Sequence, residues 1–230
     1  MADSRIAAIA ELVIKDERAA DIGTDHAKLA LYMLSAGIVP YMIISDLNNG
    51  PFNRALETVA ASLYSDKIEV RQGNGLTILK QSEVFNVILA GMGGDTIVEI
   101  LSFDLEKARS FKHYVLQPMS KPQAVRRFLS SQGWPILQEQ VVKEKEHLFV
   151  IISTCPGEKR YELTPLQMDV GPHVLENYQK AAVKEYLLSW LKKYRVALAG
   201  LESTDITGSK ILKKQYEEKI SKLKEILSDG

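Results

Sequence analysis

The sequence predicts an α/β fold in residues 1–160 and a helical segment in residues 161–230. Three observations support this division. Short apolar, β-branched runs alternate with helix-like segments up to about residue 132, as in βαβ units around a parallel sheet. Two further extended runs then follow each other closely. Beyond about residue 171 the apolar residues recur only at helical spacing.

Each element of the first domain is predicted from its own run of residues. Residues 1–17 place apolar side chains at i, i+3, i+4 and i+7, which indicates an amphipathic helix and neither a signal peptide nor a membrane span. Strands are expected at 19–23, 41–46, 68–72, 84–90 and 114–117. Helices are expected near 27–36, 51–63, 96–108 and 122–132, with a short turn near 76–80.

The segment "ILQEQVVKEKEHLFVIIST" predicts a β-hairpin, because two extended runs are separated by charged residues. A parallel sheet that ends in an antiparallel hairpin is the strand plan of class I methyltransferases. An NAD-type Rossmann domain would more often end in another βαβ crossover. The fold class predicted for residues 1–160 is therefore a Rossmann-like class I methyltransferase domain.

The second domain is predicted to be a helical hairpin. A linker containing Pro and Gly follows the β-hairpin, and from about Gly171 the sequence is typical of helices. Apolar stripes extend over residues 175–201 and 212–227, and "STDITGS" separates them. The simplest arrangement is two long helices folded into an antiparallel, coiled-coil-like hairpin.

Composition excludes several classes of protein and site. Lys+Arg and Asp+Glu both total 29, so the net charge is zero and no global field favours a polyanionic partner. The single cysteine, Cys155, excludes an internal disulfide framework and is typical of the reducing cytoplasm. The four histidines show no metal-ligand spacing. We expect a cytoplasmic monomer or weak dimer without a metal ion or a membrane-spanning helix.

The first strand ends in "DIGTDHA", and ligands of open α/β sheets bind at the carboxyl ends of the strands. Gly23 permits a tight turn, and the next helix is expected to start near Asp25 or His26, with free N–H groups facing the crevice. Asp21 and Asp25 would repel a diphosphate, and they would attract a sulfonium and an ammonium group. The turn therefore favours S-adenosyl-L-methionine over a dinucleotide, with Asp21, Ile22 and Gly23 as binding residues.

Three more strand ends carry residues suited to the rest of this cofactor. The second strand ends in Asp46, 25 residues after Asp21, at the position where Rossmann-like folds bind ribose hydroxyls. The third strand is followed by the amide of Asn74 and a tight turn, which suit the adenine edge. The fourth ends in glycines, which leave the backbone accessible, and in the polarisable Met92. Each piece alone is compatible with an ordinary turn or cap, and their recurrence in order favours a binding site. The residues are Asp46 and Leu47; Asn74, Gly75 and Leu76; and Ala90, Gly91, Met92 and Gly93.

The sequence resembles the TrmK family of bacterial tRNA methyltransferases. The resemblance covers nearly the whole chain and is carried most specifically by "DIGTDHA" together with "AGMGG". It implies transfer of a methyl group from S-adenosyl-L-methionine to N1 of adenine 22 in tRNA. It also implies that Asp21 and Gly23 line the methionine part of the cofactor, Asp46 the ribose, residues 74–76 the adenine, and residues 90–93 the floor near the methyl group.

The chain departs from the family pattern at two of these positions. Asn74 stands where the family more often has Asp, and an amide can both donate and accept at an adenine edge, so binding should survive. Asp46 stands where the family often has Glu. The shorter carboxylate changes the ribose contact.

Adenine N1 carries its own lone pair, so the reaction requires alignment of N1, the methyl carbon and the sulfur rather than a general base. A carboxylate near the N6 amino group would stabilise the positive charge that develops on the base. Asp25 is the first candidate for this role and His26 the second; alternatively, Asp25 only caps the helix and His26 only orients a hydrogen bond. Gln117 and Pro118, at the fifth strand end, are expected to shape the base pocket.

Basic residues of the helical tail are candidates for gripping the tRNA body. Lys192, Lys193 and Arg195 fall on the first tail helix, and Lys213 and Lys214 on the second. We expect this face to contact phosphates. The alternative is a solvated hairpin whose lysines pair with nearby glutamates.

Two rival functions come from other classes of protein or substrate. A class I methyltransferase acting on a small molecule or a protein would explain the strand ends and leave the basic tail unused. A non-catalytic tRNA-binding or scaffold protein would have no reason to keep buried acids such as Asp21 and Asp46. An oxidoreductase is disfavoured because the chain lacks a phosphate-binding glycine loop.

Overall fold

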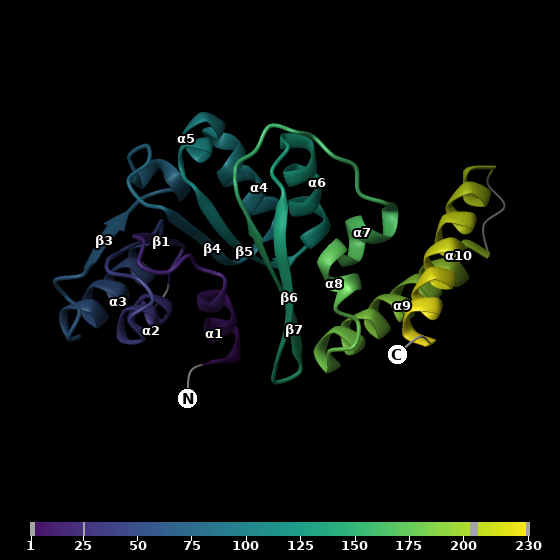
Figure 1. Ribbon diagram of the computed structural model, residues 1–230, viewed down its shortest axis with the longest axis horizontal. Helices are drawn as coiled ribbons and strands as arrows, with labels where there is room; N and C mark the ends of the chain where they lie inside the picture. Colours follow the sequence, from purple (N-terminus) through teal and green to yellow (C-terminus); the bar gives the residue numbers. More distant parts are fainter. Residues whose placement is uncertain (1–2, 25, 203–206, 229–230) are drawn as a thin grey trace. The chain divides into compact units, whose positions relative to one another are not determined.

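A computed structural model describes residues 3–24, 26–202 and 207–228, without the side chains of residues 202–209. The chain forms two compact units, Met1–Glu162 and Leu163–Gly230 (Figure 1). The division falls two residues beyond the end expected for the first domain.

The first unit is built around a seven-stranded sheet in the order β3-β2-β1-β4-β5-β7-β6. Strands β1 to β5 are parallel, and β7 pairs antiparallel with both β5 and β6. The predicted fold class, a parallel sheet finished by an antiparallel hairpin, is thereby confirmed. The bounds are β1 Ala19–Ile22, β2 Met42–Asp46, β3 Ile68–Gln72, β4 Asn86–Gly93, β5 His113–Ser120, β6 Ile136–Glu144 and β7 His147–Thr154.

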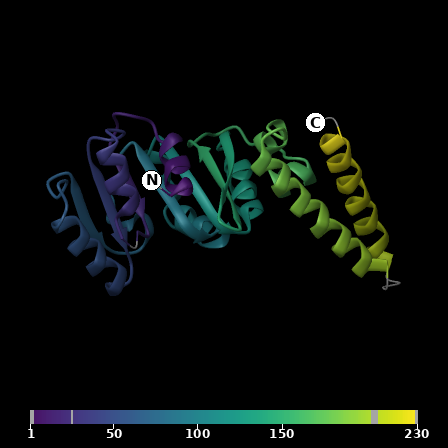
Figure 2. The same cartoon turned by 90° about the horizontal axis from the view of Figure 1, so that it is seen from below.

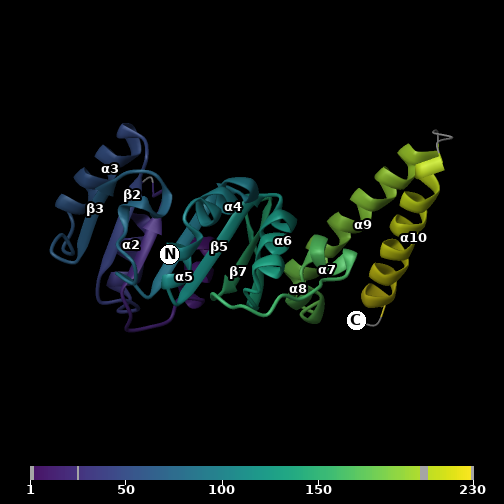
Figure 3. The same cartoon turned by 90° about the horizontal axis from the view of Figure 1, so that it is seen from above.

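Helices cover both faces of this sheet. One layer contains α1 (Ser4–Glu11), α2 (Lys28–Ser35) and α3 (Asn49–Ala60), which share a single apolar core with the strands. The other layer contains α4 (Gly94–Phe103), which packs on α6 (Pro122–Gln132), on β4 and on β5. The views from below and from above show these layers on opposite sides of the sheet (Figures 2 and 3).

Burial on both faces explains why the central strands read as continuous apolar runs. In β4, Ile88 belongs to the core beneath α1, α2 and α3. Its neighbours Val87 and Leu89 point to the opposite face and are also fully buried. A parallel sheet covered by helices on both sides requires this pattern.

Two of the predicted helices differ from the structure in where they begin or end. The second helix begins at Lys28, not near Asp25 or His26, because Ala27 adopts a left-handed conformation (φ 53°) that cannot continue a helix backwards. The expected helix 96–108 is two helices, α4 and α5 (Leu105–Ser110). Asp104 interrupts them with φ −139° and ψ 79°, and its side chain accepts a hydrogen bond from the backbone N–H of Lys107, which caps α5.

The loops and turns near the strand ends also acquire definite structure. The helix expected at 51–63 is α3, which begins two residues earlier and ends three residues earlier. The turn expected near 76–80 is a 3-10 helix, η1 (Gly75–Ile78). Gly75 has φ +52°, a conformation that favours glycine.

The second unit contains four helices in the described residues, so the prediction of two long helices from residue 171 was wrong at its start. Two short helices come first, α7 (Pro165–Val170) and α8 (Pro172–Glu176). A capping box of Thr164 and Gln167 starts α7. Two long helices, α9 (Ala181–Glu202) and α10 (Thr207–Ser228), then pack together as expected. Most of the break expected between them falls outside the described residues.

A partly buried polar contact ties three helices of the second unit together. The Tyr194 hydroxyl donates to the Asp169 carboxylate at 2.7 Å, and the Lys219 ammonium donates to the same oxygen at 2.6 Å. Burial and this acid together raise the pKa of Tyr194. Lys219 is therefore a structural residue and does not belong to a free basic surface.

Among the described residues, no helix is long and apolar enough to cross a membrane. Nor does this part of the chain bring three or more His, Cys, Asp or Glu side chains together as metal ligands.

Candidate functional site

Two cavities lie at the carboxyl ends of the parallel strands. The first, which we call the apolar cavity, has a volume of about 280 Å³ and is lined by Leu47, Asn74, Gly75, Leu76, Thr77, Thr96, Glu99, Ile100, Phe103 and Asp104. The second, which we call the polar cavity, has a volume of about 330 Å³ and is lined by Asp3, Arg5, Ile6, Ile9, Asp21, Gly23, Thr24, His26, Lys28, Leu29, Ala90 and Gly91.

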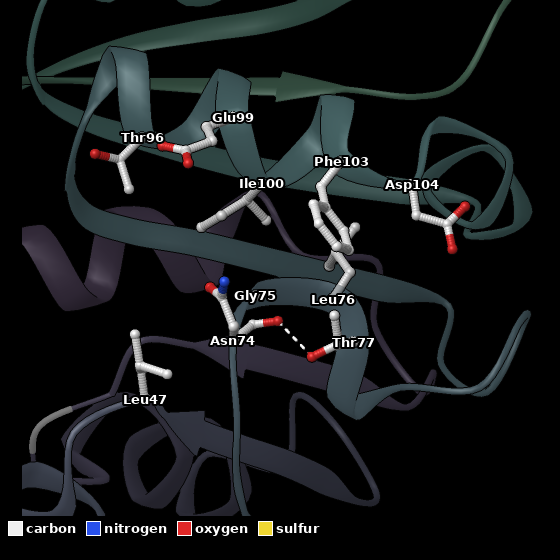
Figure 4. Close-up of a pocket in the computed structure, with 10 residues that line it drawn as sticks. All are labelled: Leu47, Asn74, Gly75, Leu76, Thr77, Thr96, Glu99, Ile100, Phe103 and Asp104. Carbon is white, nitrogen blue, oxygen red and sulfur yellow. Dashed lines mark hydrogen bonds between the residues drawn. The ribbon is translucent and has the colours of Figure 1, made fainter.

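The apolar cavity has the character of a site for a flat ring with a polar edge. Figure 4 shows Ile100 and Phe103 projecting from α4, opposite Leu47 and Asn74. Leu47 and Phe103 are 57% and 74% exposed, unusually open for such side chains, and a bound ring would cover them. The Asn74 carbonyl accepts a hydrogen bond from the Thr77 hydroxyl at 2.6 Å, which fixes this turn.

Asp46 ends β2 immediately before Leu47 of the apolar cavity. Its carboxylate accepts a hydrogen bond from the backbone N–H of Asn48 at 2.7 Å. A carboxylate has lone pairs for several further donors. Asp46 itself lines neither cavity. The acid predicted to bind the ribose is therefore next to the apolar cavity in sequence but is not enclosed by it.

Asp21 is the buried acid of the polar cavity. Asp21 is only 5% exposed, and this burial raises the pKa of its carboxyl group to about 6. A hydrogen bond with Thr24 and the positive charge of Arg5 oppose this effect. A cationic group entering the cavity would favour the ionised form in the same way.

Gly23 brings the turn after β1 into contact with the C-terminal end of β4. Its φ is +85°, and a Cβ atom built on it would lie 2.2 Å from the terminal methyl carbon of Met92. The Met92 side chain therefore packs directly on the glycine. Of the predicted floor, Ala90 and Gly91 line the polar cavity, whereas Met92 and Gly93 lie outside both linings.

Gln117 holds the C-terminal end of β4 in place. It is fully buried, and its side-chain oxygen accepts hydrogen bonds from the backbone N–H of Gly91 at 3.1 Å and from Nη1 of Arg5 at 3.3 Å. Neither Gln117 nor the buried Pro118 lines either cavity. The structure thus places Gln117 behind Gly91, at the register shift near the end of β4, where it supports the site rather than opening into it.

Of the two catalytic candidates, Asp25 and His26, the structure describes only His26. Asp25 lies outside the described residues. His26 is exposed and lines the polar cavity.

The sequence did not indicate the helical walls of the two cavities. Helix α1 contributes Arg5, Ile6 and Ile9 together with its N-cap residue Asp3, and α4 contributes Thr96, Glu99, Ile100 and Phe103. The amphipathic pattern of α1 predicted that this helix packs on the domain. The residues at the strand ends do not indicate which helix closes a cavity. A charged residue inside the apolar pattern, such as Arg5, was the available signal.

The predicted basic residues of the tail are mostly exposed. Lys192 and Arg195 face solvent, the Lys193 ammonium lies 4.5 Å from the Trp190 ring centroid, and Lys213 is half-buried. Lys214 lies 4.0 Å from Glu218, one of the pairings that the alternative interpretation expected.

Comparison with known proteins gave consistent matches. A family model described as a methyltransferase domain matches residues 2–152. The tRNA (adenine(22)-N(1))-methyltransferase of Bacillus subtilis is 25% identical over 230 residues, covering 98% of this chain and 97% of that protein.

Two solved structures are similar over the whole chain. A Streptococcus agalactiae protein of the NADB-Rossmann superfamily is 30% identical, with a TM-score of 0.84, and the match covers 99% of this chain and 97% of that one. A Streptococcus pneumoniae protein, proposed to be a tRNA (m1A22) methyltransferase and solved with S-adenosyl-L-methionine, is 25% identical, with a TM-score of 0.83. That match covers 99% and 100% of the two chains.

Proposed function

The chain belongs to the methyltransferase-domain family, and from this premise we propose that it transfers a methyl group from S-adenosyl-L-methionine to N1 of an adenine in tRNA. The observation that carries the proposal is the pair of cavities at the strand ends, one apolar and open, the other lined by a buried acid. The Bacillus subtilis relative acts on adenine 22, and we propose the same nucleotide here. Action on tRNA accords with a cytoplasmic location.

The residues present fit this cofactor. The apolar cavity suits the adenine ring, with Asn74 at its polar edge and the exposed Leu47 and Phe103 at its rim. Asp46 is assigned to the ribose. Asp21 is assigned to the ammonium group, because a buried carboxylate with a raised pKa is stabilised in its ionised form by a cation. The bound cofactor supplies an electrophilic methyl group on a sulfonium.

The chain's own contribution to the reaction is alignment and charge. N1 of the target adenine attacks with its own lone pair, so the protein must hold it in line with the methyl carbon and the sulfur. We retain Asp25 as the carboxylate that stabilises the cationic base, and His26 of the polar cavity as the second candidate. Gln117 is reassigned from the base pocket to the support of Gly91 at the end of β4.

The tail is assigned to the tRNA body. Lys192, Lys193 and Arg195 on α9, and Lys213 and Lys214 on α10, supply cations for phosphate contacts. Such contacts orient the RNA and carry no base specificity. The site in the first unit then selects the nucleotide.

The proposal is tested by incubating the full chain with methyl-labelled S-adenosyl-L-methionine and unmodified tRNA. Reverse transcription arrests at an N1-methylated adenine, so we expect a stop at adenine 22 and none on a transcript with guanine at that position. Label in the RNA without this stop would contradict the assigned nucleotide. Label in a small molecule or a protein but not in tRNA would contradict the assigned substrate class.

The ribose assignment has a separate test. The substitution Asp46→Ala should weaken S-adenosylhomocysteine binding about tenfold or more in calorimetry, since a charged hydrogen bond is lost. The exposed Asp66 belongs to neither cavity lining, and Asp66→Ala should leave binding unchanged. Equal affinity in the Asp46→Ala variant and the wild type would overturn the assignment.

A further inference from the structure

Helix α1 contributes one wall of the polar cavity, and its Arg5 is the only guanidinium in the lining. The Arg5 guanidinium lies over the Phe149 ring at 5.4 Å from the centroid, and Nη1 donates to Gln117 at 3.3 Å. These contacts hold the side chain on the cavity wall. A guanidinium fixed in this way loses little freedom when it binds a ligand.

The donors of Arg5 exceed the acceptors that the protein supplies. Its Nε atom is buried and has no hydrogen-bond partner among the described residues. Native structures seldom leave such a donor without a partner. Arg5 therefore has binding capacity that its contacts with Gln117 and Phe149 do not use.

The polar cavity places a positive and a negative group in one enclosure. Arg5 is close enough to Asp21 to lower the pKa of that carboxyl group by its charge. The carboxylate of Asp21 cannot bind an anion, and a guanidinium cannot bind an ammonium group. A ligand that satisfies both groups carries a carboxylate and an ammonium, as the amino-acid end of S-adenosyl-L-methionine does.

We propose that Arg5 binds the carboxylate of the cofactor's amino-acid end while Asp21 binds its ammonium group, an inference that rests on the proposed function. Lys28 also lines the cavity, but it is exposed and its ammonium is a point charge on a flexible stem. Arg5 is anchored by two contacts and can offer paired donors to the two carboxylate oxygens. Gln117 then has two functions, holding Gly91 at the end of β4 and orienting Arg5.

The test compares three ligands by calorimetry with the whole 230-residue chain. S-Adenosylhomocysteine carries both groups, 5′-deoxy-5′-(3-aminopropylthio)adenosine keeps the amine and lacks the carboxylate, and 5′-methylthioadenosine lacks both. We expect Arg5→Met to weaken S-adenosylhomocysteine about 10–100-fold and to change the other two less than about twofold. Asp21→Asn should weaken the first two ligands and leave 5′-methylthioadenosine unchanged.

Further variants separate this role from folding and from RNA binding. Arg5→Lys keeps the charge without the paired donors and should fall between the wild type and Arg5→Met. Arg18, which lies over the Tyr41 ring and lines neither cavity, provides the matched control, and Arg18→Met should leave all three affinities unchanged.

Several results would overturn the inference. Equal weakening of all three ligands by Arg5→Met would show a structural role, and unchanged affinities would show no role. A raised KM for tRNA with unchanged S-adenosylhomocysteine affinity would assign Arg5 to a phosphate of the RNA. Failure of the wild-type chain to bind S-adenosylhomocysteine would overturn the proposed function together with this inference, whereas the other results leave that function intact.

Discussion

The burial of Asp21 opposes stability in the absence of a ligand. Its pKa in the folded protein is about 6, above the ordinary value of 3.8, so the folded state binds more protons than the unfolded state between these two values. The free energy of unfolding therefore decreases as the pH rises through this window, and the loss is complete above about pH 6. A cation bound at Asp21 would offset the loss.

Replacing Asp21 should separate stability from binding. We expect Asp21→Asn to raise the free energy of unfolding by about 1–3 kcal/mol at pH 7 and to have little effect near pH 4. Denaturant unfolding at the two pH values measures this difference, with Asp66→Asn as the exposed control. An equal change at both pH values would show that ionisation of Asp21 is not its cause.

The structure shows why a glycine is required at position 23. The substitution Gly23→Ala should cost about 1–2 kcal/mol, because φ is +85° and the new Cβ would contact Met92. The double variant Gly23→Ala with Met92→Ala removes the contact and leaves the backbone strain. Gly200→Ala on α9, where a Cβ meets nothing within 4 Å, should instead stabilise the protein slightly.

Thermal and denaturant unfolding compare these glycine variants. A Gly23→Ala protein as stable as the wild type would show that the backbone at this turn relaxes without cost. Sequence analysis identified Gly23 as a turn residue from "DIGTD". The contact with Met92, 69 residues later, could not be predicted because it depends on the register of β1 beside β4.

At the scale of elements, a buried ion pair joins α6 to the edge strand β6. Nε of Arg126 donates to the Glu139 carboxylate at 2.7 Å, and both side chains are completely buried. Removing one partner would leave an uncompensated buried charge, which costs more than the pair itself contributes.

We therefore expect Glu139→Gln to lower the free energy of unfolding by about 3–5 kcal/mol. Replacing both partners by methionine should recover much of this loss. The exposed Lys121–Asp95 pair provides the contrast, and Asp95→Asn should cost less than about 1 kcal/mol. A double methionine variant no more stable than Glu139→Gln would contradict an electrostatic cause.

Element order was predictable from the sequence, whereas several boundaries were not. Alternating apolar runs indicated the parallel sheet, and "KEKE" between two extended runs indicated the terminal hairpin. The break at Asp104 was missed because the apolar spacing continues through it into α5. Pro165 was assigned to a linker, although Pro is also favoured in the first turn of a helix, where it begins α7.

At the scale of the whole molecule, the strand-end residues were predictable because parallel strands end at one edge of the sheet. This rule led to Asp21, Asn74 and Gly91, all of which line a cavity. It could not lead to Arg5 or Phe103, which come from helices. Which helix closes a cavity depends on packing against the sheet, and a single sequence does not encode that as a local pattern.

The charge of the second unit decides how the tRNA contacts proposed for it should be tested. Residues 163–230 contain 11 Lys and Arg and 9 Asp and Glu, so the excess of positive charge is small. Binding must then depend on a few placed cations rather than on a strong general field. Each phosphate contact that is lost should reduce the slope of log Kd against log salt concentration by roughly 1.

The double substitution Lys213→Glu with Lys214→Glu should weaken tRNA binding and reduce the slope of log Kd against log salt by about 1–2. S-Adenosylhomocysteine affinity should not change, because the cofactor residues all belong to the first unit. Lys67→Glu with Lys80→Glu, exposed in the first unit, is the matched control for charge. Circular dichroism checks that α10 remains folded, since Lys214 lies near Glu218. An unchanged salt slope would show that α10 does not contact phosphates, and the lysines of α10 would then be a solvated face.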